Sequence, residues 1–272
     1  MQRPKFSIIS PTLEGFDYLE RHLNSVRSQG LPAHEVEHWI IDGGSKDGSR
    51  AYLTAQRDIR FVSEPDRGLS HAVNKGIERA TGDWIIWLNV DDQLAPNSLQ
   101  SFLDHVKEDE ASEIVCGAQE VRDYEGNTVE ISPPWKYTAS QLLKTRTAII
   151  QASTFVHRSV YESVGGMDES YKFAMDYEWM VRASLQFKCR TIPSVLTIYN
   201  RRKGSITDVG TAKQHREFLR VRRKYKCSFL ETMEWKLRFY LATEPLRKVR
   251  WFRRFVQLLK QYPSSACHAT KA

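Results

Sequence analysis

The sequence predicts an α/β fold in which a mostly parallel central sheet is flanked by helices. Over the first 117 residues, short apolar runs of strand length alternate with amphipathic segments of helix length. This alternation is typical of parallel strands joined by crossover helices. Residues 84–88 also form an uninterrupted apolar run, as expected for a strand that is buried on both faces of a parallel sheet.

The patterns place five strands in this first half, at residues 6–10, 36–41, 59–62, 84–88 and 114–117. Helices are expected between them, at residues 17–29, 50–57, 72–80 and 96–106. Residues 118–150 show no clear period and include a Ser-Pro-Pro-Trp stretch, so we expect an irregular loop region there.

Helical patterns return at residues 159–164, 176–187 and 211–226, and a further helix is expected to begin near Pro245. Asp176 stands at the start of its helix, where the helix dipole stabilises an ionised carboxylate. The alternative is that Asp176 only caps this helix, because aspartate is among the commonest N-cap residues.

The composition is that of an ordinary soluble globular protein, with 272 residues, 41% hydrophobic and 27% charged. No apolar run approaches the roughly 18–20 residues of a membrane span, and the N-terminal segment lacks a signal-peptide pattern. The four cysteines are scattered without metal-ligand or redox spacing, which favours free thiols in a reducing compartment. We therefore expect a cytoplasmic protein.

Charge is distributed unevenly along the chain. Residues 201–272 hold 19 Lys and Arg against 5 Asp and Glu, a net charge of +14, whereas residues 1–200 carry −7. The helix expected near Pro245 combines an apolar side with many basic residues, which is typical of a segment lying on an anionic membrane surface. The same pattern suits a helix that docks on the rest of the protein and leaves its charges in water.

An acidic turn follows the apolar run at residues 84–88, where Asn89 is followed closely by Asp91 and Asp92. In an open α/β sheet, ligands bind just beyond the carboxyl ends of the strands. Adjacent carboxylates at such a place suit Mg²⁺ or Mn²⁺ carrying a phosphorylated substrate. The alternative is a plain polar turn, for which Asp and Asn are ordinary residues.

Further motifs follow one another along the chain. They are Ser10-Pro11-Thr12, Asp42-Gly43-Gly44-Ser45-Lys46-Asp47-Gly48-Ser49, Glu64-Pro65-Asp66-Arg67-Gly68, Asn74-Lys75-Gly76, Asn89-Val90-Asp91-Asp92, Gly165-Gly166-Met167-Asp168-Glu169 and Asp176-Tyr177-Glu178-Trp179-Met180-Val181-Arg182. With these motifs in this order, residues 5–225 resemble a family 2 glycosyltransferase of the GT-A fold, of the type that builds bacterial cell-surface polysaccharides such as lipopolysaccharide.

The resemblance implies an enzyme that moves a sugar from a nucleotide-sugar to an acceptor hydroxyl with inversion. It divides the chain into a GT-A catalytic domain at residues 1–210, with a nucleotide-binding half at 1–117 and an acceptor-binding half at 118–210. A basic helical C-terminal extension would follow at residues 211–272. The expected partners are a nucleotide-diphospho-sugar, with UDP as the favoured nucleotide, a glycolipid or polysaccharide acceptor, and an anionic membrane surface, but no nucleic acid.

The same resemblance assigns roles to individual residues. Asp42 would accept a hydrogen bond from the nucleobase, and Arg67 would approach the diphosphate or, alternatively, lie on the surface as a solvated charge. The nucleotide-sugar site as a whole would comprise Pro11, Thr12, Glu14, Asp42, Gly44, Ser45, Asp66, Arg67, Asn89 and Asp91. Asp91, with Asp92 close behind, would hold Mn²⁺ or Mg²⁺ on the diphosphate.

On the acceptor side, Asp176 would be the catalytic base that takes the proton of the acceptor hydroxyl. Glu178 and Trp179 would contact the acceptor, although Trp179 also suits packing inside its helix.

Three departures from the family pattern concern the metal ligands and the number of sugars transferred. Asn89 replaces the first acid of the usual metal motif, so it can form hydrogen bonds but supplies no charge. Residues 199–202 lack the histidine often found there in relatives, which leaves a third metal ligand from that loop in doubt. The Gln-x-x-Arg-Trp motif of processive members is missing, which favours transfer of a single sugar.

Two other functions suit parts of the sequence. A sugar-phosphate nucleotidyltransferase would share the acidic metal site but would want a Gly-rich, basic loop after the first strand, where residues 11–15 offer none. A basic nucleic-acid-binding module suits the sequence pI near 9.2 but leaves the acidic body unexplained.

Overall fold

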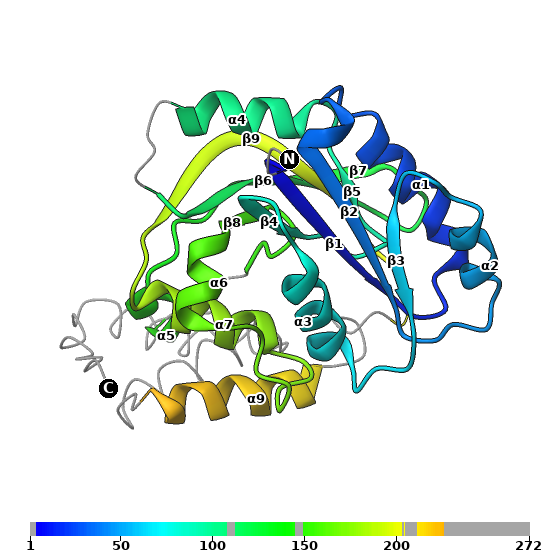
Figure 1. Cartoon of the computed structure of the whole chain (residues 1–272). Helices are drawn as coiled ribbons and strands as arrows, with labels where there is room; N and C mark the ends of the chain where they lie inside the picture. The colour runs from blue at the N-terminus through cyan, green and yellow to red at the C-terminus, as the bar shows by residue number, and fades with distance from the viewer. Residues whose placement is uncertain (1–3, 108–111, 145–148, 203, 205–210, 226–272) are drawn as a thin grey trace.

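The computed structural model describes residues 4–107, 112–144, 149–202, 204 and 211–225. A nine-stranded sheet runs through the molecule in the order β3-β2-β1-β4-β8-β6-β9-β5, and β7 pairs with β6 outside this path (Figure 1). One face of the sheet packs against α1 and α4, and the other against α3, α6 and α7. The prediction of an α/β fold with a central sheet between helices is confirmed.

The parallel arrangement is complete in the first four strands. Its elements are β1 (Phe6–Thr12), α1 (Phe16–Arg27), a 3₁₀ turn (Ala33–Glu35), β2 (Val36–Asp42), α2 (Ser49–Thr54), β3 (Arg60–Ser63), α3 (Leu69–Arg79) and β4 (Trp84–Trp87). β1 pairs in parallel with both β2 and β4, and β2 pairs in parallel with β3. Each predicted element of this half is present, with bounds that differ by a few residues.

β4 is buried on both faces of the sheet, as its apolar run predicts. Ile85 and Trp87 belong to the core that α3 and α7 cover, whereas Trp84 and Ile86 belong to the core under α4. Because successive side chains of a strand point to opposite faces, an apolar run without alternation is what a strand covered on both sides requires.

The second half of the sheet is mixed. Its elements are β5 (Gln93–Leu94), α4 (Ser98–Lys107), β6 (Ile114–Arg122), β7 (Thr128–Ser132), α5 (Ala139–Lys144), β8 (Thr154–His157), α6 (Arg158–Val164), α7 (Met175–Ser184) and β9 (Cys189–Asn200). β6 pairs in parallel with β9 but antiparallel with β7 and β8. β6 therefore crosses residue 117, the predicted boundary between the two halves.

The prediction of an irregular region at residues 118–150 is wrong. β6 continues to Arg122, and β7 and α5 follow within the same stretch. β7 is an edge strand of five residues whose apolar side chains, Val129 and Ile131, are exposed, and its short alternation was not recognised as a strand. β9 was not predicted at all, because Pro193 interrupts its pattern. The β6–β9 register shifts beside this proline, which accommodates its missing N–H.

The first helix of the predicted C-terminal extension packs against the preceding part of the chain. α9 (Thr211–Lys224) contacts α7, and its Val221 is fully buried in the core that α7 and α3 share (Figure 1). Residues 226–272, which include the helix expected near Pro245, lie outside the described residues. Within the described residues, no helix is long and apolar enough to span a membrane.

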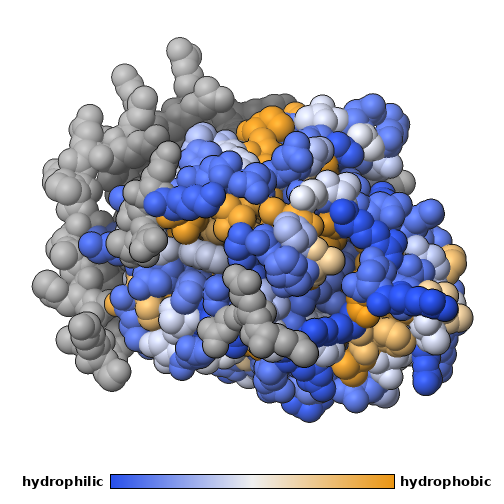
Figure 2. Space-filling model, turned by 45° about the horizontal axis from the view of Figure 1, so that its top comes forward, coloured by the Kyte–Doolittle hydropathy of each residue, from blue (hydrophilic) through white to orange (hydrophobic). Residues whose placement is uncertain are grey.

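The surface seen in Figure 2 is mostly hydrophilic, and hydrophobic side chains gather there in separate patches. Among the described residues, the large hydrophobic side chains that are exposed are Leu13, Phe16, Tyr124, Val129, Ile131 and Trp135.

Candidate active site

One cavity of about 690 Å³ lies beyond the carboxyl ends of β1 and β4. Its lining comes from both halves of the chain, including the β1–α1 turn, the turn after β4, strands β6 and β7, and the start of α7. A volume of this size is typical of small-molecule sites. The cavity lies where ligands bind in open α/β sheets, at the carboxyl ends of the parallel strands.

The acidic turn after β4 lies in this lining and is tied to the end of β9. The backbone N–H of Asp92 donates to the Asn89 carbonyl at 3.0 Å, which closes the turn. The Asn200 side chain donates to the Asp91 carbonyl at 2.8 Å, and the Asn200 N–H donates to the Asp92 carboxylate at 3.2 Å. The Asp91 carboxylate forms an ion pair with Arg202. Burial, and then the neighbouring Asp91 charge, raise the pKa of Asp92 well above its ordinary value.

A buried polar chain supports this turn from below. His22 Nδ1 lies 2.8 Å from the Asp92 carbonyl, and a carbonyl only accepts, so Nδ1 carries the proton. His22 Nε2 then accepts from the Ser10 hydroxyl at 2.8 Å, and His38 Nε2 lies 3.0 Å from the same hydroxyl oxygen. Burial lowers the pKa of His22 to about 4 and that of His38 well below its ordinary value, so both imidazoles are neutral at pH 7.

The nucleotide side of the cavity contains several of the residues predicted there. Pro11, Thr12, Glu14, Asp66 and Asn89 all line it. The Thr12 hydroxyl is buried and has no hydrogen-bond partner among the described residues, so it remains free for a ligand. Glu14 also accepts from the Lys46 N–H at 3.0 Å, which joins the β1–α1 turn to the loop after β2.

Asp42 is hydrogen-bonded to its own loop, and its expected bond from a nucleobase stays a prediction. It is fully buried and outside the cavity lining, and its carboxylate accepts hydrogen bonds from the hydroxyls of Ser45 and Ser63. Gly44 and Ser45 likewise lie outside the lining; Gly44 has a φ of 90°, which glycine adopts without strain. These residues shape the loop after β2 rather than the cavity wall.

Arg67 is likewise not among the residues that line the cavity. Its guanidinium forms a two-bond ion pair with Glu169, at 2.9 and 3.1 Å. Because Glu169 follows the Gly165-Gly166 turn, this pair links the two halves of the chain instead of offering a free fork to a diphosphate. The neighbouring Asp66 carboxylate accepts from the Gly68 N–H at 2.8 Å and remains in the lining.

Asp176 lies in the same cavity as Asp91 and Asp92, at the second residue of α7. Its carboxylate accepts the Tyr177 N–H at 2.8 Å. Burial raises the pKa of Asp176 to about 6, against the effect of this hydrogen bond. A carboxylate with this pKa is ionised at neutral pH yet basic enough to accept a proton in a reaction. One cavity is thus lined both by an acidic turn that suits a metal ion and by a carboxylate that suits a general base.

The family is decided by residues 7–165, which match the model of glycosyl transferase family 2. The chain belongs to this family. The matched segment is more than half of the chain; it contains Asp91 and Asp92 and ends before Asp176. Membership makes the chain a glycosyltransferase, so neither of the alternatives weighed from the sequence is needed.

Individual relatives agree with this assignment. An uncharacterized glycosyltransferase of Mycobacterium tuberculosis is 28% identical over 223 residues, which cover 79% of each chain. A PGL/p-HBAD biosynthesis glycosyltransferase of Mycobacterium bovis is 28% identical over 205 residues, which cover 73% of this chain and 75% of the relative.

Solved structures of glycosyltransferases share the fold. S. aureus TarS 1–349 in complex with UDP-GlcNAc superposes with a TM-score of 0.66 at 15% identity, over 92% of this chain and 77% of that one. The mannosyltransferase PcManGT of Pyrobaculum calidifontis, in complex with GDP-Man and Mn²⁺, gives a TM-score of 0.64 at 16% identity, over 99% and 79%. This chain spans 46% of a longer TarS chain. The GT-A fold expected from the motifs is confirmed.

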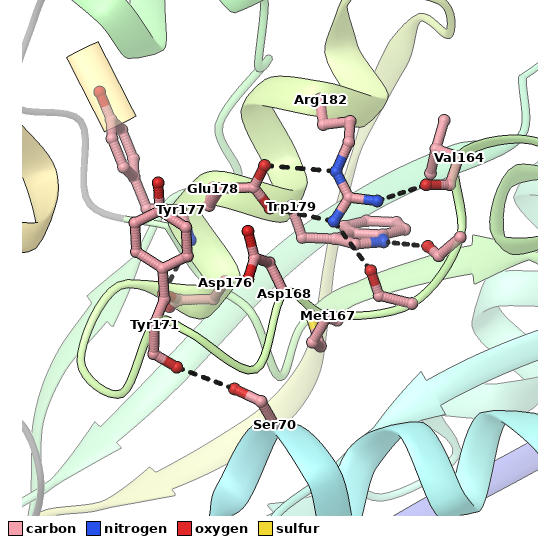
Figure 3. A network of polar contacts seen from close by, with 12 residues as sticks. Ser70, Val164, Met167, Asp168, Tyr171, Asp176, Tyr177, Glu178, Trp179 and Arg182 are labelled. Atoms are coloured by element: carbon pink, nitrogen blue, oxygen red, sulfur yellow. Dashed lines mark hydrogen bonds and ion pairs between the residues drawn. The ribbon is translucent and has the colours of Figure 1, made fainter. Parts of the chain in front are cut away.

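Two residues expected to contact the acceptor lie inside the glycosyltransferase instead. The Glu178 side chain is fully buried and accepts from Lys224 at 2.7 Å and from Arg182 at 2.9 Å, the latter shown in Figure 3. Trp179 is 2% exposed; its indole N–H donates to the Gly165 carbonyl at 2.9 Å, and its ring stacks on Tyr161 at 4.7 Å. A fully buried carboxylate already bound to two cations has no surface for an acceptor, so the prediction for Glu178 is wrong. Trp179 packs, as the alternative held.

The α9 helix helps to build the cavity of this family member. The Glu217 carboxylate accepts the backbone N–H groups of Lys172, Phe173 and Ala174, at 2.7 to 3.1 Å. These three residues directly precede α7, so Glu217 fixes the segment that delivers Asp176. Gln214 of α9 lines the cavity and donates to the Phe173 carbonyl at 3.2 Å.

Sequence reasoning missed several lining residues. Arg202 was noted only for not being a histidine, yet it pairs with Asp91. Glu130 and Ser132 come from β7, the strand that was not predicted, and their alternation in Thr-Val-Glu-Ile-Ser is the signal that was available. Gln119, Gln151 and Gln214 also line the cavity, and nothing in the sequence singles them out.

Asp91 and Asp92 are the residues that could hold a divalent metal. Mg²⁺ or Mn²⁺ bound with a diphosphate commonly uses only one or two protein carboxylates and takes its other ligands from phosphates and water. The two lining carboxylates fit that requirement, and the described residues offer no cluster of three or more His, Cys, Asp or Glu that would make a complete protein cage. The Asp91–Arg202 ion pair would have to open for Asp91 to bind a metal.

Proposed function

We propose that this glycosyltransferase moves a single sugar from a nucleotide-diphospho-sugar, with UDP as the favoured nucleotide, to a hydroxyl of a glycolipid or polysaccharide precursor, with inversion. The observation that carries the proposal is that Asp91 and Asp176 line one cavity from opposite halves of the chain. A direct displacement needs a group for the departing phosphate and a base for the incoming hydroxyl, and these carboxylates supply both.

In this mechanism Asp176 accepts the proton of the acceptor hydroxyl. As that proton leaves, the acceptor oxygen forms a bond to the anomeric carbon of the sugar. The bond from that carbon to the phosphate oxygen breaks, and its electron pair leaves with the nucleoside diphosphate. The pKa of about 6 keeps Asp176 ionised and ready at neutral pH. The displacement passes through no sugar–enzyme bond, which is why one base is sufficient.

Asp91, together with Asp92, would hold Mg²⁺ or Mn²⁺ at the diphosphate. The metal would supply positive charge to stabilise the charge that develops on the leaving diphosphate. Two neighbours of the same fold support a nucleotide-sugar and a divalent cation, since one binds UDP-GlcNAc and the other GDP-Man with Mn²⁺. Thr12 and Glu14 would face the nucleotide, because both line the cavity beyond β1.

The C-terminal region completes the proposal. Residues 1–210 with α9 would form the catalytic unit, and the +14 charge of residues 201–272 would hold the enzyme against the anionic inner face of the cell membrane. Sedimentation with vesicles rich in anionic lipid tests this role. Replacing the five basic residues between 247 and 254 with glutamine should reduce sedimentation and leave nucleotide binding unchanged; equal sedimentation would contradict it.

The reaction itself is tested by a screen of UDP-, GDP- and dTDP-sugars with Mn²⁺, in which release of the nucleoside diphosphate is measured. We expect release from a UDP-sugar that requires both the divalent cation and Asp176. Release that persists at the same rate in Asp176→Asn would contradict the assigned base. The absence of release and of binding with all three donors would contradict the proposed reaction.

A further inference from the structure

The ion pair between Arg202 and Asp91 places a cation on the carboxylate proposed to bind the metal. Both residues line the cavity, and Arg202 lies just beyond the end of β9, 111 residues away in the chain. The Arg202 side chain is 42% exposed, whereas the Asp91 side chain is 13% exposed. The guanidinium therefore covers a carboxylate that is otherwise directed at the cavity, and it has open space into which it can move.

The local charge is nearly balanced by this pair. The Asp92 side chain is buried and its carboxylate already accepts the Asn200 N–H, so Asp91 presents the more accessible carboxylate of the turn. Arg202 offsets the charge of that carboxylate. Arg21 lies close as well, but its guanidinium donates to the Asp91 backbone carbonyl, at 3.3 Å, and not to the Asp91 carboxylate. A dication arriving alone would meet a neutralised site with further positive charge beside it, so the pair opposes binding of a free metal.

A nucleoside diphosphate changes this balance, because it offers new acceptors for the guanidinium. Arginine binds phosphate oxygens with a planar fork of donors, and such bonds between charged groups are among the strong ones. The Tyr18 ring, 5.7 Å from the Arg202 guanidinium carbon, also lines the cavity and keeps the guanidinium near it. Arg202 can thus exchange Asp91 for phosphate oxygens within the same cavity.

We propose that Arg202 is a built-in counterion that competes with the divalent cation for Asp91 and passes to the diphosphate when donor and metal bind together. The proposal rests on the proposed function, since it assumes a diphosphate in this cavity. It makes metal binding and nucleotide binding mutually dependent: metal alone binds weakly, and metal with nucleotide binds well, because the phosphates release Asp91 from Arg202. Arg202 thus makes the site favour metal and nucleotide together over metal alone, and it transfers no proton.

The test compares full-length wild type with Arg202→Gln in two titrations. In the first, Mn²⁺ is added without nucleotide and free Mn²⁺ is followed by electron paramagnetic resonance. Arg202→Gln should bind Mn²⁺ about tenfold more tightly than wild type. In the second, UDP is added at saturating Mn²⁺ in a calorimeter. Arg202→Gln should bind UDP about tenfold more weakly, a difference of about 1.4 kcal/mol. The two affinities should therefore change in opposite directions.

Two further variants separate this effect from general loss of charge or of fold. Arg202→Lys keeps the positive charge but loses the fork, so it should keep the weak Mn²⁺ binding of wild type and recover part of the UDP affinity. Arg21→Gln removes a neighbouring charge that does not touch the carboxylate, so its Mn²⁺ affinity should change less than about threefold. Melting curves check that each variant is folded.

Unchanged Mn²⁺ affinity in Arg202→Gln would overturn the competition, and unchanged UDP affinity would overturn the transfer to the diphosphate. If wild type bound neither UDP nor GDP with Mn²⁺, the proposed function would fail. The nucleotide-free Mn²⁺ titration would still decide whether Arg202 and the metal compete.

Discussion

The two carboxylate sites that face each other across the cavity are built by opposite means. Asp91 follows a buried strand, and its carboxylate is paired with the Arg202 guanidinium. Asp176 begins a helix, has no cation bonded to its carboxylate among the described residues, and has a pKa raised by burial to about 6. A carboxylate held beside a cation suits the role of a ligand, whereas a desolvated one is basic enough to take a proton. The surroundings, more than the residue type, assign the two roles.

The comparison also shows how differently the two sites are held in place. The acidic turn depends on the neutral chain of Ser10, His22 and His38 below it and on Asn200 beside it. Asp176 depends on one charged group from a distant helix, Glu217, which fixes the segment before α7. We therefore expect the acidic turn to tolerate changes in the C-terminal helix, and the base to be sensitive to them.

Asp176→Asn should have the largest effect on transfer. The amide keeps the size of the side chain and can still accept the Tyr177 N–H, but it cannot take the acceptor proton. We expect transfer to slow by roughly 10²–10⁴-fold with nearly unchanged affinity for UDP and Mn²⁺. Transfer rate and calorimetric affinity on the same preparation check this.

The matched control for that change is Glu162→Gln, which neutralises an exposed carboxylate on α6 away from the cavity and should keep the full rate. If Asp176→Asn also kept the full rate, Asp176 would not be the base, and its part would be limited to accepting the Tyr177 N–H, which an amide oxygen can also do.

Asp91→Asn should have the next largest effect, on donor binding. Loss of the metal ligand should weaken metal-dependent UDP binding by about 10²-fold, since metal ligation contributes several kcal/mol. Asp92→Asn should cost less than about tenfold, because the raised pKa of Asp92 and its bond from the Asn200 N–H give it a largely structural part. Calorimetry with and without Mn²⁺ measures both, and equal losses in the two variants would remove the distinction between the two acids.

Glu217→Ala should affect the base but leave the acidic turn unchanged. The N–H groups of Lys172, Phe173 and Ala174 would lose their acceptor, so we expect roughly 1–3 kcal/mol of destabilisation and a transfer rate lowered by about tenfold. UDP affinity should stay within about twofold of wild type. Glu217→Gln, which keeps an acceptor oxygen, should recover most of the rate. A loss of UDP affinity equal to the loss of rate would mean that α9 supports the whole cavity and not the base alone.

The pH dependence should show the smallest effects. Transfer should fall about fivefold between pH 6 and pH 5, because Asp176, with a pKa of about 6, must be ionised to act. Stability should change in the other direction. The folded-state pKa of Asp176 lies above its ordinary value of 3.8, so its contribution is full below pH 3.8 and is lost as pH rises through about 6.

Asp176→Asn should remove that pH dependence, and at pH 7.5 it should therefore be slightly more stable than wild type, by about 1–2 kcal/mol. Melting temperatures of the two proteins at pH 5 and pH 7.5 make this comparison. A variant less stable than wild type at pH 7.5 would show that burial does not oppose ionisation at this position.

Particular elements show how much of the fold could be predicted from the sequence. The order of β1 to β4 and the acidic turn after β4 followed from local patterns, because strand ends and turn residues are encoded within a few positions. The position of Asp176 near a helix start also followed from a local motif, and its role as base stays a prediction. β7 and β9 were not predicted: the alternation in β7 covers only five residues at a sheet edge, and Pro193 interrupts the pattern of β9.

The sequence by itself singled out three carboxylates that line the cavity: Asp91 and Asp92 at the end of a buried strand, and Asp176 near the start of a helix. Only the tertiary structure decided their surroundings. It placed Arg202 on Asp91, Glu217 before Asp176, and Glu178 in a buried ion cluster away from the cavity. The physical reason is that local patterns fix the periods and ends of helices and strands. A side chain 111 residues away finds its partner only when the whole sheet and its helices have packed.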